Sequence, residues 1–302
     1  MLTLLSHIRA VLQMSRRTRR LTRALRLSQL GRAWLRWAVL PKELTRPDDV
    51  TVVIAVRNRC DYRLANALRS IRLQTHPADL VHTLVVDYGS ESTSQRLTAA
   101  LCQTHGAEYV RVNGAPVWSR SRGLNVGVRC AVTKYLLTSD ADIVFSPRYL
   151  SDSIVALRGS PLSVVCSPMF DLPEWSTDIV KQAANSGKDP DFEQWKEWCS
   201  PRLGWAFHPS IAFTFAAFYQ AIRGYDEFYE VYGAEDDDLM LRFGYLALQP
   251  NILDSGSFYM HQWHPKFEGV PGGVHNNQIK RNRMYLRRMH SIVRNDGGWG
   301  HH

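Results

Sequence analysis

The chain has 302 residues, of which 45% are hydrophobic and 22% are charged, so it can bury a full core. Its formal net charge is +9, yet residues 1–40 hold nine arginines and no acid, and the remainder has equal numbers of basic and acidic residues. This confinement of the excess charge to one segment argues against a nucleic-acid-binding protein, and no nucleic acid partner is expected.

The sequence also limits the compartment. It contains no run of the roughly 20 apolar residues that a membrane-spanning helix needs, and its start lacks the pattern of a cleaved signal peptide. The five cysteines are odd in number and form no C-x-x-C pair, so we expect them to be reduced and not to bind zinc. A cytoplasmic location is predicted.

The arginines of residues 1–40 alternate with leucines and tryptophans at spacings close to three and four, which predicts one or two basic amphipathic helices. Such a helix can lie on an anionic membrane surface, which would make the protein peripheral on the inner face of the cell membrane. It can equally pack on the catalytic domain or on a partner protein. Both interpretations stay open.

A polar connector containing Pro41 follows, and strands then alternate with helices, which is typical of an α/β domain with a mostly parallel sheet. The pattern predicts strands over 50–56, 80–86, 108–112 and 135–137, and helices over 61–74, 92–105 and 124–134. From 172 to 209 the periodicity fails, and we expect an irregular insertion.

We divide the chain accordingly into a basic helical extension and linker over 1–48 and one α/β domain over 49–302. This domain comprises a first half over 49–145, a second half over 146–275 and a C-terminal helical segment over 276–302.

Three polar motifs are candidates for chemistry: Asp140-x-Asp142 after an apolar strand, four acids from Glu235 to Asp238 before a helix, and His261-Gln-Trp-His264. Each motif alone has an ordinary structural explanation, such as a turn or a helix N-terminus. Together, carboxylates and imidazoles supply ligands for Mn²⁺ or Mg²⁺ and leave open positions for diphosphate oxygens. A separate carboxylate can then accept the proton of a hydroxyl.

Six segments resemble family 2 glycosyltransferases of the GT-A fold, over roughly residues 50–270. They are V-V-I-A-V-R-N-R over 52–59, V-V-D-Y-G-S over 85–90, S-R-S-R-G-L-N-V-G over 119–127, S-D-A-D-I over 139–143, Y-G-A-E-D-D-D over 232–238 and H-Q over 261–262. The segment over 232–238, with G-Y-D-E before it, is similar to a stretch of β-1,4-galactosyltransferases and chondroitin polymerases. Because the matches occur in order, they are specific as a set.

The resemblance implies that 49–302 is the catalytic domain, that its half over 49–145 binds the nucleotide and its half over 146–275 the acceptor, and that the insertion over 172–209 lies near the acceptor site. It also implies a role for each position. The metal ligands would be Asp142, Asp140, which contacts either ribose or the metal through water, and His261, with His264 as a further ligand or lid residue. Donor contacts would come from Ala55, Arg57, Asp87, Arg122, Asn125 and Asp140, with Arg122 alternatively pairing with an aspartate of the D-x-D. Asp236 would be the general base, and Glu235 would position donor or acceptor hydroxyls. Tyr88 departs from the family pattern, which has an acid there.

The function that the resemblance implies is an inverting, metal-dependent transfer of a sugar from a nucleotide diphosphate sugar, with UDP expected, to an acceptor hydroxyl. A small molecule, a glycolipid or a growing polysaccharide all remain possible acceptors. The alternatives are a metal-dependent phosphohydrolase and a non-catalytic nucleotide-sugar-binding protein. Trp205 and Trp263 are candidate sugar-stacking rings, although large aromatic side chains more often pack in a core.

Overall fold

The computed structural model describes residues 33, 35–113, 117–201, 210–254, 256–265 and 274–301. Most of the basic segment, and with it the amphipathic helix predicted over 1–40, lies outside these residues. The described part of the segment forms a π-helical turn, Leu35–Val39, followed by the short helix α3, Leu40–Leu44. The connector predicted from Pro41 is therefore wrong in its first half. Pro41 lies in the first turn of α3, where a missing N–H is tolerated.

The main sheet has seven strands in the order β10-β6-β9-β4-β1-β2-β3. Strand β1 pairs in parallel with β2 and with β4, and β2 pairs in parallel with β3. Strand β9 is antiparallel to both β4 and β6. The fold class predicted from the sequence, a mostly parallel α/β sheet flanked by helices, is confirmed. The strands are β1 Val50–Val56, β2 Val81–Tyr88, β3 Glu108–Val112, β4 Tyr135–Ser139, β6 Ser163–Cys166, β9 Ala212–Phe215 and β10 Gln249–Ile252.

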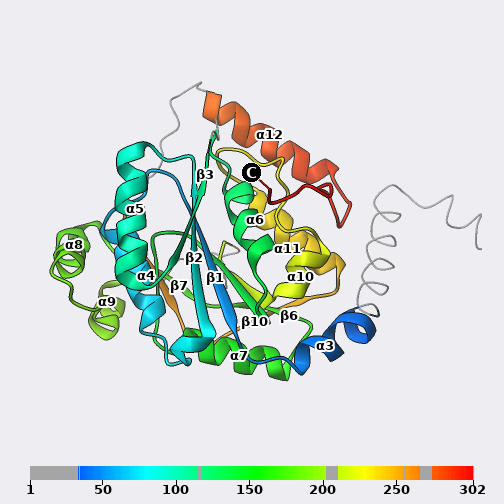
Figure 1. Cartoon of the computed structure of the whole chain (residues 1–302), viewed down its shortest axis with the longest axis horizontal. Helices are drawn as coiled ribbons and strands as arrows, with labels where there is room; N and C mark the ends of the chain where they lie inside the picture. Colours follow the sequence, from blue (N-terminus) through cyan, green and yellow to red (C-terminus); the bar gives the residue numbers. More distant parts are fainter. Residues whose placement is uncertain are drawn as a thin grey trace, which may run out of the picture.

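Helices cover both faces of this sheet, with α4 and α5 on one side and α6, α10 and α11 on the other (Figure 1). Their bounds are α4 Tyr62–Arg72, α5 Ser92–His105, α6 Arg120–Cys130, α7 Tyr149–Gly159, α8 Thr177–Asn185, α9 Phe192–Trp198, α10 Ala216–Ala221, α11 Glu235–Tyr245 and α12 Val274–Arg288. Two 3₁₀ turns, Ala78–Leu80 and Glu174–Ser176, complete the helical elements of the described residues. None of the described helices is long and apolar enough to cross a membrane.

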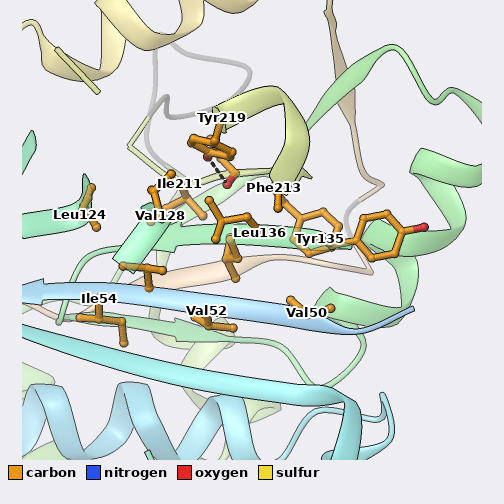
Figure 2. Close-up of a cluster of buried hydrophobic side chains, with 14 of the residues drawn as sticks. Val50, Val52, Ile54, Leu124, Val128, Tyr135, Leu136, Ile211, Phe213 and Tyr219 are labelled. Atoms are coloured by element: carbon orange, nitrogen blue, oxygen red, sulfur yellow. Dashed lines mark hydrogen bonds between the residues drawn. The ribbon is translucent and has the colours of Figure 1, made fainter. Parts of the chain in front are cut away.

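The core contains side chains of the adjacent strands β1, β4 and β9 and of the helices α6 and α10 (Figure 2). Every residue of β1 is buried, as its β-branched sequence predicts for a central parallel strand. Helix α6 begins four residues before its predicted start because the Ser119 hydroxyl caps it by accepting from the Arg122 N–H. It lies close to the sheet at Gly127, where a Cβ would come within 2.3 Å of Val53.

A second, smaller sheet has the order β5-β11-β7-β8, with β5 Ile143–Phe145, β7 Met169–Asp171, β8 Ser200–Pro201 and β11 Tyr259–His261. Strand β11 runs antiparallel to β5 and parallel to β7. The insertion predicted to be irregular over 172–209 contains the helices α8 and α9, so that prediction is wrong for this part of it. Residues 202–209, with Trp205, lie outside the described residues.

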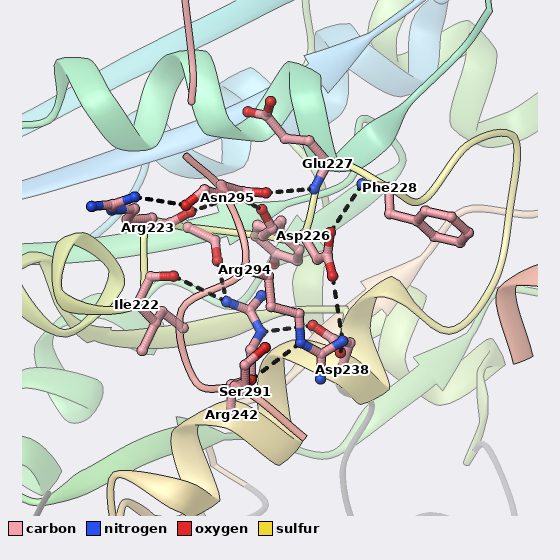
Figure 3. A network of polar contacts seen from close by, with 12 residues as sticks. Ile222, Arg223, Asp226, Glu227, Phe228, Asp238, Arg242, Ser291, Arg294 and Asn295 are labelled. Carbon is pink, nitrogen blue, oxygen red and sulfur yellow. Dashed lines mark hydrogen bonds and ion pairs between the residues drawn. The ribbon is translucent and has the colours of Figure 1, made fainter. Parts of the chain in front are cut away.

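The end of the chain packs against α11 through a network of buried charges (Figure 3). Asp238 pairs with Arg242 at 2.6 Å and with Arg294 at 2.5 Å, and Arg294 also pairs with Asp226 at 3.3 Å. These two acids and two arginines balance in charge, as buried ionised groups require. Helix α11, which carries the candidate catalytic acids at its N-terminus, is therefore held by residues of the C-terminal segment.

Candidate active site

The D-x-D motif and the histidine motif meet because the second sheet joins them. Strand β4 ends at Ser139, the motif forms the turn into β5, and β11 pairs with β5 so that His261 lies opposite Ile143. The Gln262 N–H donates to the Asp142 carbonyl at 2.9 Å. Residues more than a hundred positions apart in the sequence are thereby brought together at one edge of the fold.

Asp142, His261 and His264 form the candidate metal centre. One carboxylate oxygen and one nitrogen of each imidazole lie within 4.8 Å of one another, and His264 Nε2 is 3.5 Å from Asp142 Oδ2. Asp140, also predicted as a ligand, is not part of this group, because its carboxylate pairs with an arginine. One carboxylate and two imidazoles are a donor set that suits a divalent transition ion and leaves coordination positions open.

Both imidazole rings are held through their other nitrogen. His261 Nδ1 is 3.1 Å from Asp171 Oδ1, and His264 Nδ1 is 2.8 Å from the Pro265 carbonyl oxygen. Contacts of this kind orient metal-binding histidines and fix which nitrogen faces the ion, so the geometry fits Nε2 ligation by both rings. Sequence reasoning missed Asp171; its only signal was an acid at the end of a short apolar stretch.

Arg120 links the D-x-D motif to the acidic helix. Its Nε donates to Asp140 at 2.5 Å, its Nη1 donates to Asp236 at 2.6 Å, and its Nη2 donates to the Ser210 carbonyl at 2.8 Å. Burial alone would lower the pKa of this guanidinium, but the two carboxylates raise the pKa well above its ordinary value. Arg122 was predicted as an alternative partner for an aspartate of the D-x-D motif, but in the structure Arg120 makes this pair.

The candidate catalytic acids Glu235 and Asp236 begin α11. Burial raises the pKa of Asp236 to about 8, Arg120 opposes this rise, and the nearby Glu235 and Asp140 add to it. Burial likewise raises the pKa of Glu235, whose Oε2 has no hydrogen-bond partner among the described residues. A carboxyl with a pKa near neutrality is suited to general base catalysis, and a buried oxygen without a partner is available to a ligand hydroxyl.

The loop before α11 has an unusual backbone. Val231, Gly233 and Ala234 have positive φ angles of 64°, 100° and 76°, and for a β-branched residue such as Val231 this conformation is strained. Asn282 of α12 holds the loop by donating to the carbonyls of Glu230 and Tyr232. Helix α12 therefore supports the conformation in which Glu235 and Asp236 enter the site.

The residues predicted to contact the donor are arranged around the ends of β1 and β2. Ala55 is a buried residue of β1 and Arg57 is half-buried directly after it. Asp87, at the end of β2, is fully buried and accepts hydrogen bonds from the Ser90 N–H and the Tyr109 hydroxyl. A structural role in this turn thus accounts for Asp87, and its contact with a base or ribose stays a prediction.

Arg122 and Asn125 of α6 do not face the D-x-D motif. Arg122 lies beside the Tyr88 hydroxyl and donates to the Glu227 carbonyl at 3.2 Å. Asn125 is fully buried; its amide donates to Tyr225 O and Glu227 Oε1, and its carbonyl accepts from Tyr225 N–H. The structure gives Asn125 a place in the protein interior, which does not favour the donor contact predicted for it.

Two family descriptions match the sequence. Residues 51–206 match "Glycosyl transferase family 2", and residues 203–265 match "N-terminal domain of galactosyltransferase". Between them these matches include the ends of β1 and β2, the D-x-D motif, the acidic helix and both histidines. A search of curated proteins found no match.

Solved structures of Staphylococcus aureus TarS are similar to this chain in fold. The full TarS structure has a TM-score of 0.52 at 13% identity and covers 72% of this chain and 37% of its own. TarS 1–349 in complex with UDP-GlcNAc has a TM-score of 0.53 at 14% identity and covers 72% of this chain and 59% of its own. TarS 1–349 in complex with UDP has a TM-score of 0.50 at 16% identity, with coverages of 72% and 61%. This chain therefore spans less than two thirds of each TarS chain it matches.

Proposed function

Because the chain belongs to glycosyl transferase family 2, we propose that it transfers a sugar from a UDP-sugar to an acceptor hydroxyl, with a divalent metal ion in the site. The observation that carries the proposal is the continuous chain of contacts from Asp236 through Arg120 to the D-x-D motif and on to His264. The proposal is supported because a carboxylate with a raised pKa is linked, through Arg120, to the motif that carries the candidate metal ligand Asp142. The bound UDP-GlcNAc and UDP of the TarS structures support the choice of donor.

Asp142, His261 and His264 would hold the metal ion. When bound, the ion supplies positive charge that stabilises the departing diphosphate. Because two of the three ligands are imidazoles, and magnesium prefers oxygen ligands, the site favours Mn²⁺ over Mg²⁺.

The side chains of the acidic helix carry out the transfer. Asp236 accepts the proton of the acceptor hydroxyl. The hydroxyl oxygen bonds to the anomeric carbon of the donor sugar as the bond from that carbon to the UDP oxygen breaks. The configuration is therefore inverted. Arg120 holds Asp236 in place and stabilises its ionised form, while Glu235 accepts hydrogen bonds from sugar hydroxyls through its buried oxygen.

The test is calorimetric titration with a panel of nucleotide sugars, with and without Mn²⁺, on the wild type, Asp142→Ala and Asp236→Asn. Sugar transfer and donor hydrolysis by the same proteins are measured in a separate activity assay. We expect one UDP-sugar to bind only with the metal, Asp142→Ala to lose this binding, and Asp236→Asn to bind the donor yet transfer no sugar. Binding in Asp142→Ala equal to that of the wild type would contradict the metal site. Donor hydrolysis with no transfer to any acceptor would favour the phosphohydrolase, and full activity of Asp236→Asn would remove the general base from the mechanism.

Most of residues 1–40, for which contact with an anionic membrane or a partner protein was predicted, lies outside the described residues.

A further inference from the structure

Two tryptophans lie side by side on the insertion that follows β7. The rings of Trp175 and Trp198 have centroids 5.3 Å apart and are tilted by 60°. Trp175 is 61% exposed, and it is the only tryptophan among the large apolar side chains that are exposed in the described residues. Two neighbouring indole rings, one of them largely exposed and the other partly exposed, offer an aromatic surface on which a ligand can stack.

The strand register places this pair next to the candidate metal centre. Asp171, which contacts His261, is paired in register with Ser200 of β8. Trp175 follows Asp171 by four residues and Trp198 precedes Ser200 by two. At no more than about 3.6 Å per residue, Trp175 lies within about 14 Å of Asp171 along the chain, and Trp198 within about 7 Å of Ser200. Strands β7 and β11 run parallel and end at Asp171 and His261, so both tryptophans lie beyond the end of the sheet that carries the metal centre.

The pair rests on an ordered base. Trp198 packs against a separate apolar cluster in which Trp195, Leu172 and Val180 of the insertion are buried. Asp191 caps α9 by accepting from the Gln194 N–H at 3.1 Å, and the Ser176 hydroxyl donates to the Pro173 carbonyl at 2.7 Å. Because the rings are already positioned, a ligand that stacks on them would not bear the cost of ordering the insertion.

Charges around the pair select the kind of ligand. Glu174 and Glu197 are exposed and directly precede the two tryptophans in the sequence, and Asp178 is exposed three residues after Trp175. Lys196 directs its Nζ toward the Phe258 ring, 4.2 Å from its centroid, and the exposed Lys181 lies six residues beyond Trp175, so acids outnumber bases around the pair. An acidic rim repels phosphate or carboxylate groups, and its oxygens accept hydrogen bonds from hydroxyls. An uncharged saccharide fits this chemistry, since it offers apolar C–H faces to the rings and hydroxyls to the rim.

We propose that Trp175 and Trp198 form an acceptor platform that binds the sugar units of an uncharged saccharide beyond the unit that reacts. The inference rests on the proposed transferase function and extends it by naming the acceptor class. The platform would hold the acceptor chain while its terminal hydroxyl lies at Asp236, so a longer saccharide should bind more tightly than a monosaccharide.

The test measures acceptor KM with linear uncharged oligosaccharides of increasing length, from a methyl monosaccharide to a hexasaccharide, using whichever donor binds. The variants are Trp175→Ala, Trp175→Tyr and, as a matched control on the same insertion, Ile179→Ala, which removes another exposed apolar side chain. We expect Trp175→Ala to raise KM for the long acceptors about tenfold, on the scale of one aromatic contact. The tyrosine variant should keep part of the effect, while KM for the monosaccharide, donor affinity and donor hydrolysis should stay unchanged.

Three results would overturn the platform: the same length dependence in Trp175→Ala as in the wild type, an equal loss in Ile179→Ala, or a preference of the wild type for phosphate-bearing over uncharged acceptors. Wild-type donor hydrolysis without transfer to any saccharide would also overturn it, while leaving the donor site intact. If the wild type neither binds nor turns over a nucleotide sugar, the transferase function itself fails and the platform falls with it. The indole N–H signals of Trp175 and Trp198 in NMR spectra should shift on addition of the hexasaccharide alone.

Discussion

Replacing Arg120 with methionine tests how this arginine controls the pKa of Asp236, the proposed general base. In the wild type burial raises the pKa of Asp236 to about 8, even though Arg120 donates to its carboxylate at 2.6 Å and favours the charged form. A hydrogen bond to a charged group contributes about 1.5–3 kcal/mol, so its removal should raise this pKa further. Since about 1.4 kcal/mol corresponds to a factor of ten, the fraction of ionised Asp236 at pH 7 should fall roughly 10- to 100-fold.

The assay is the pH dependence of kcat/KM, which reports the free enzyme. A base must be deprotonated to act, so kcat/KM of the wild type should rise with pH and level off above about pH 8. In Arg120→Met the rise should move to higher pH, with most of the activity recovered in alkaline buffer, and Arg120→Lys should lie between the two because it keeps the charge. A uniform loss at every pH would refute the reasoning and would place Arg120 in donor binding instead.

Three other predictions follow from contacts described above. Asp171→Ala should weaken Mn²⁺ binding in the presence of UDP about 10- to 100-fold by calorimetry, because it removes the acceptor that orients His261; unchanged affinity would show that Asp171 has no such role. Arg294→Met should lower the free energy of unfolding by about 3–5 kcal/mol in urea titrations, since it leaves Asp226 and Asp238 underpaired, and a loss below about 1 kcal/mol would contradict this. Gly224→Ala should destabilise more than its control Gly187→Ala: both have positive φ, which costs about 1–2 kcal/mol, but only at Gly224 would the Cβ come within 2.2 Å of Asn125 Oδ1. Equal losses in the two glycine variants would mean that Asn125 moves aside.

The regular part of the fold could be predicted because local patterns determine it. The helix Ser92–His105 and the strand Glu108–Val112 were predicted to the residue, and β1 was recognised from its uninterrupted β-branched sequence. The start of α6 was missed, because the cap at Ser119 depends on backbone geometry rather than on hydrophobic periodicity. The helices of the insertion were missed as well, since they are short and bury only one or two side chains each.

The candidate site was predictable only in part. Asp142 and His261 were expected together because the family resemblance gives both as metal ligands, and the structure brings them together. The second sheet that joins them was not predicted, since its strands have only two or three residues each. The pairing of Asp140 with Arg120 rather than Arg122 could not be predicted from the sequence. The two arginines alternate along one polar segment, and tertiary contacts determine their partners. Arg120 reaches across 116 positions to Asp236, and Asp171 reaches across 90 to His261, distances at which sequence spacing carries no information.

The buried pairing of Asp226 and Asp238 with Arg294 has a consequence for how this chain can diverge from its relatives. Loss of one of these charged side chains leaves an uncompensated charge buried in the interior. Replacing all of them with apolar side chains of similar volume often leaves the stability of a protein unchanged or raises it. Substitutions at these positions should therefore arise as compensated sets in homologous sequences, not singly. The family matches end at residue 265, whereas Arg294, the partner of these acids, lies in the C-terminal segment. The residues that should change together therefore extend beyond the region that the family descriptions match.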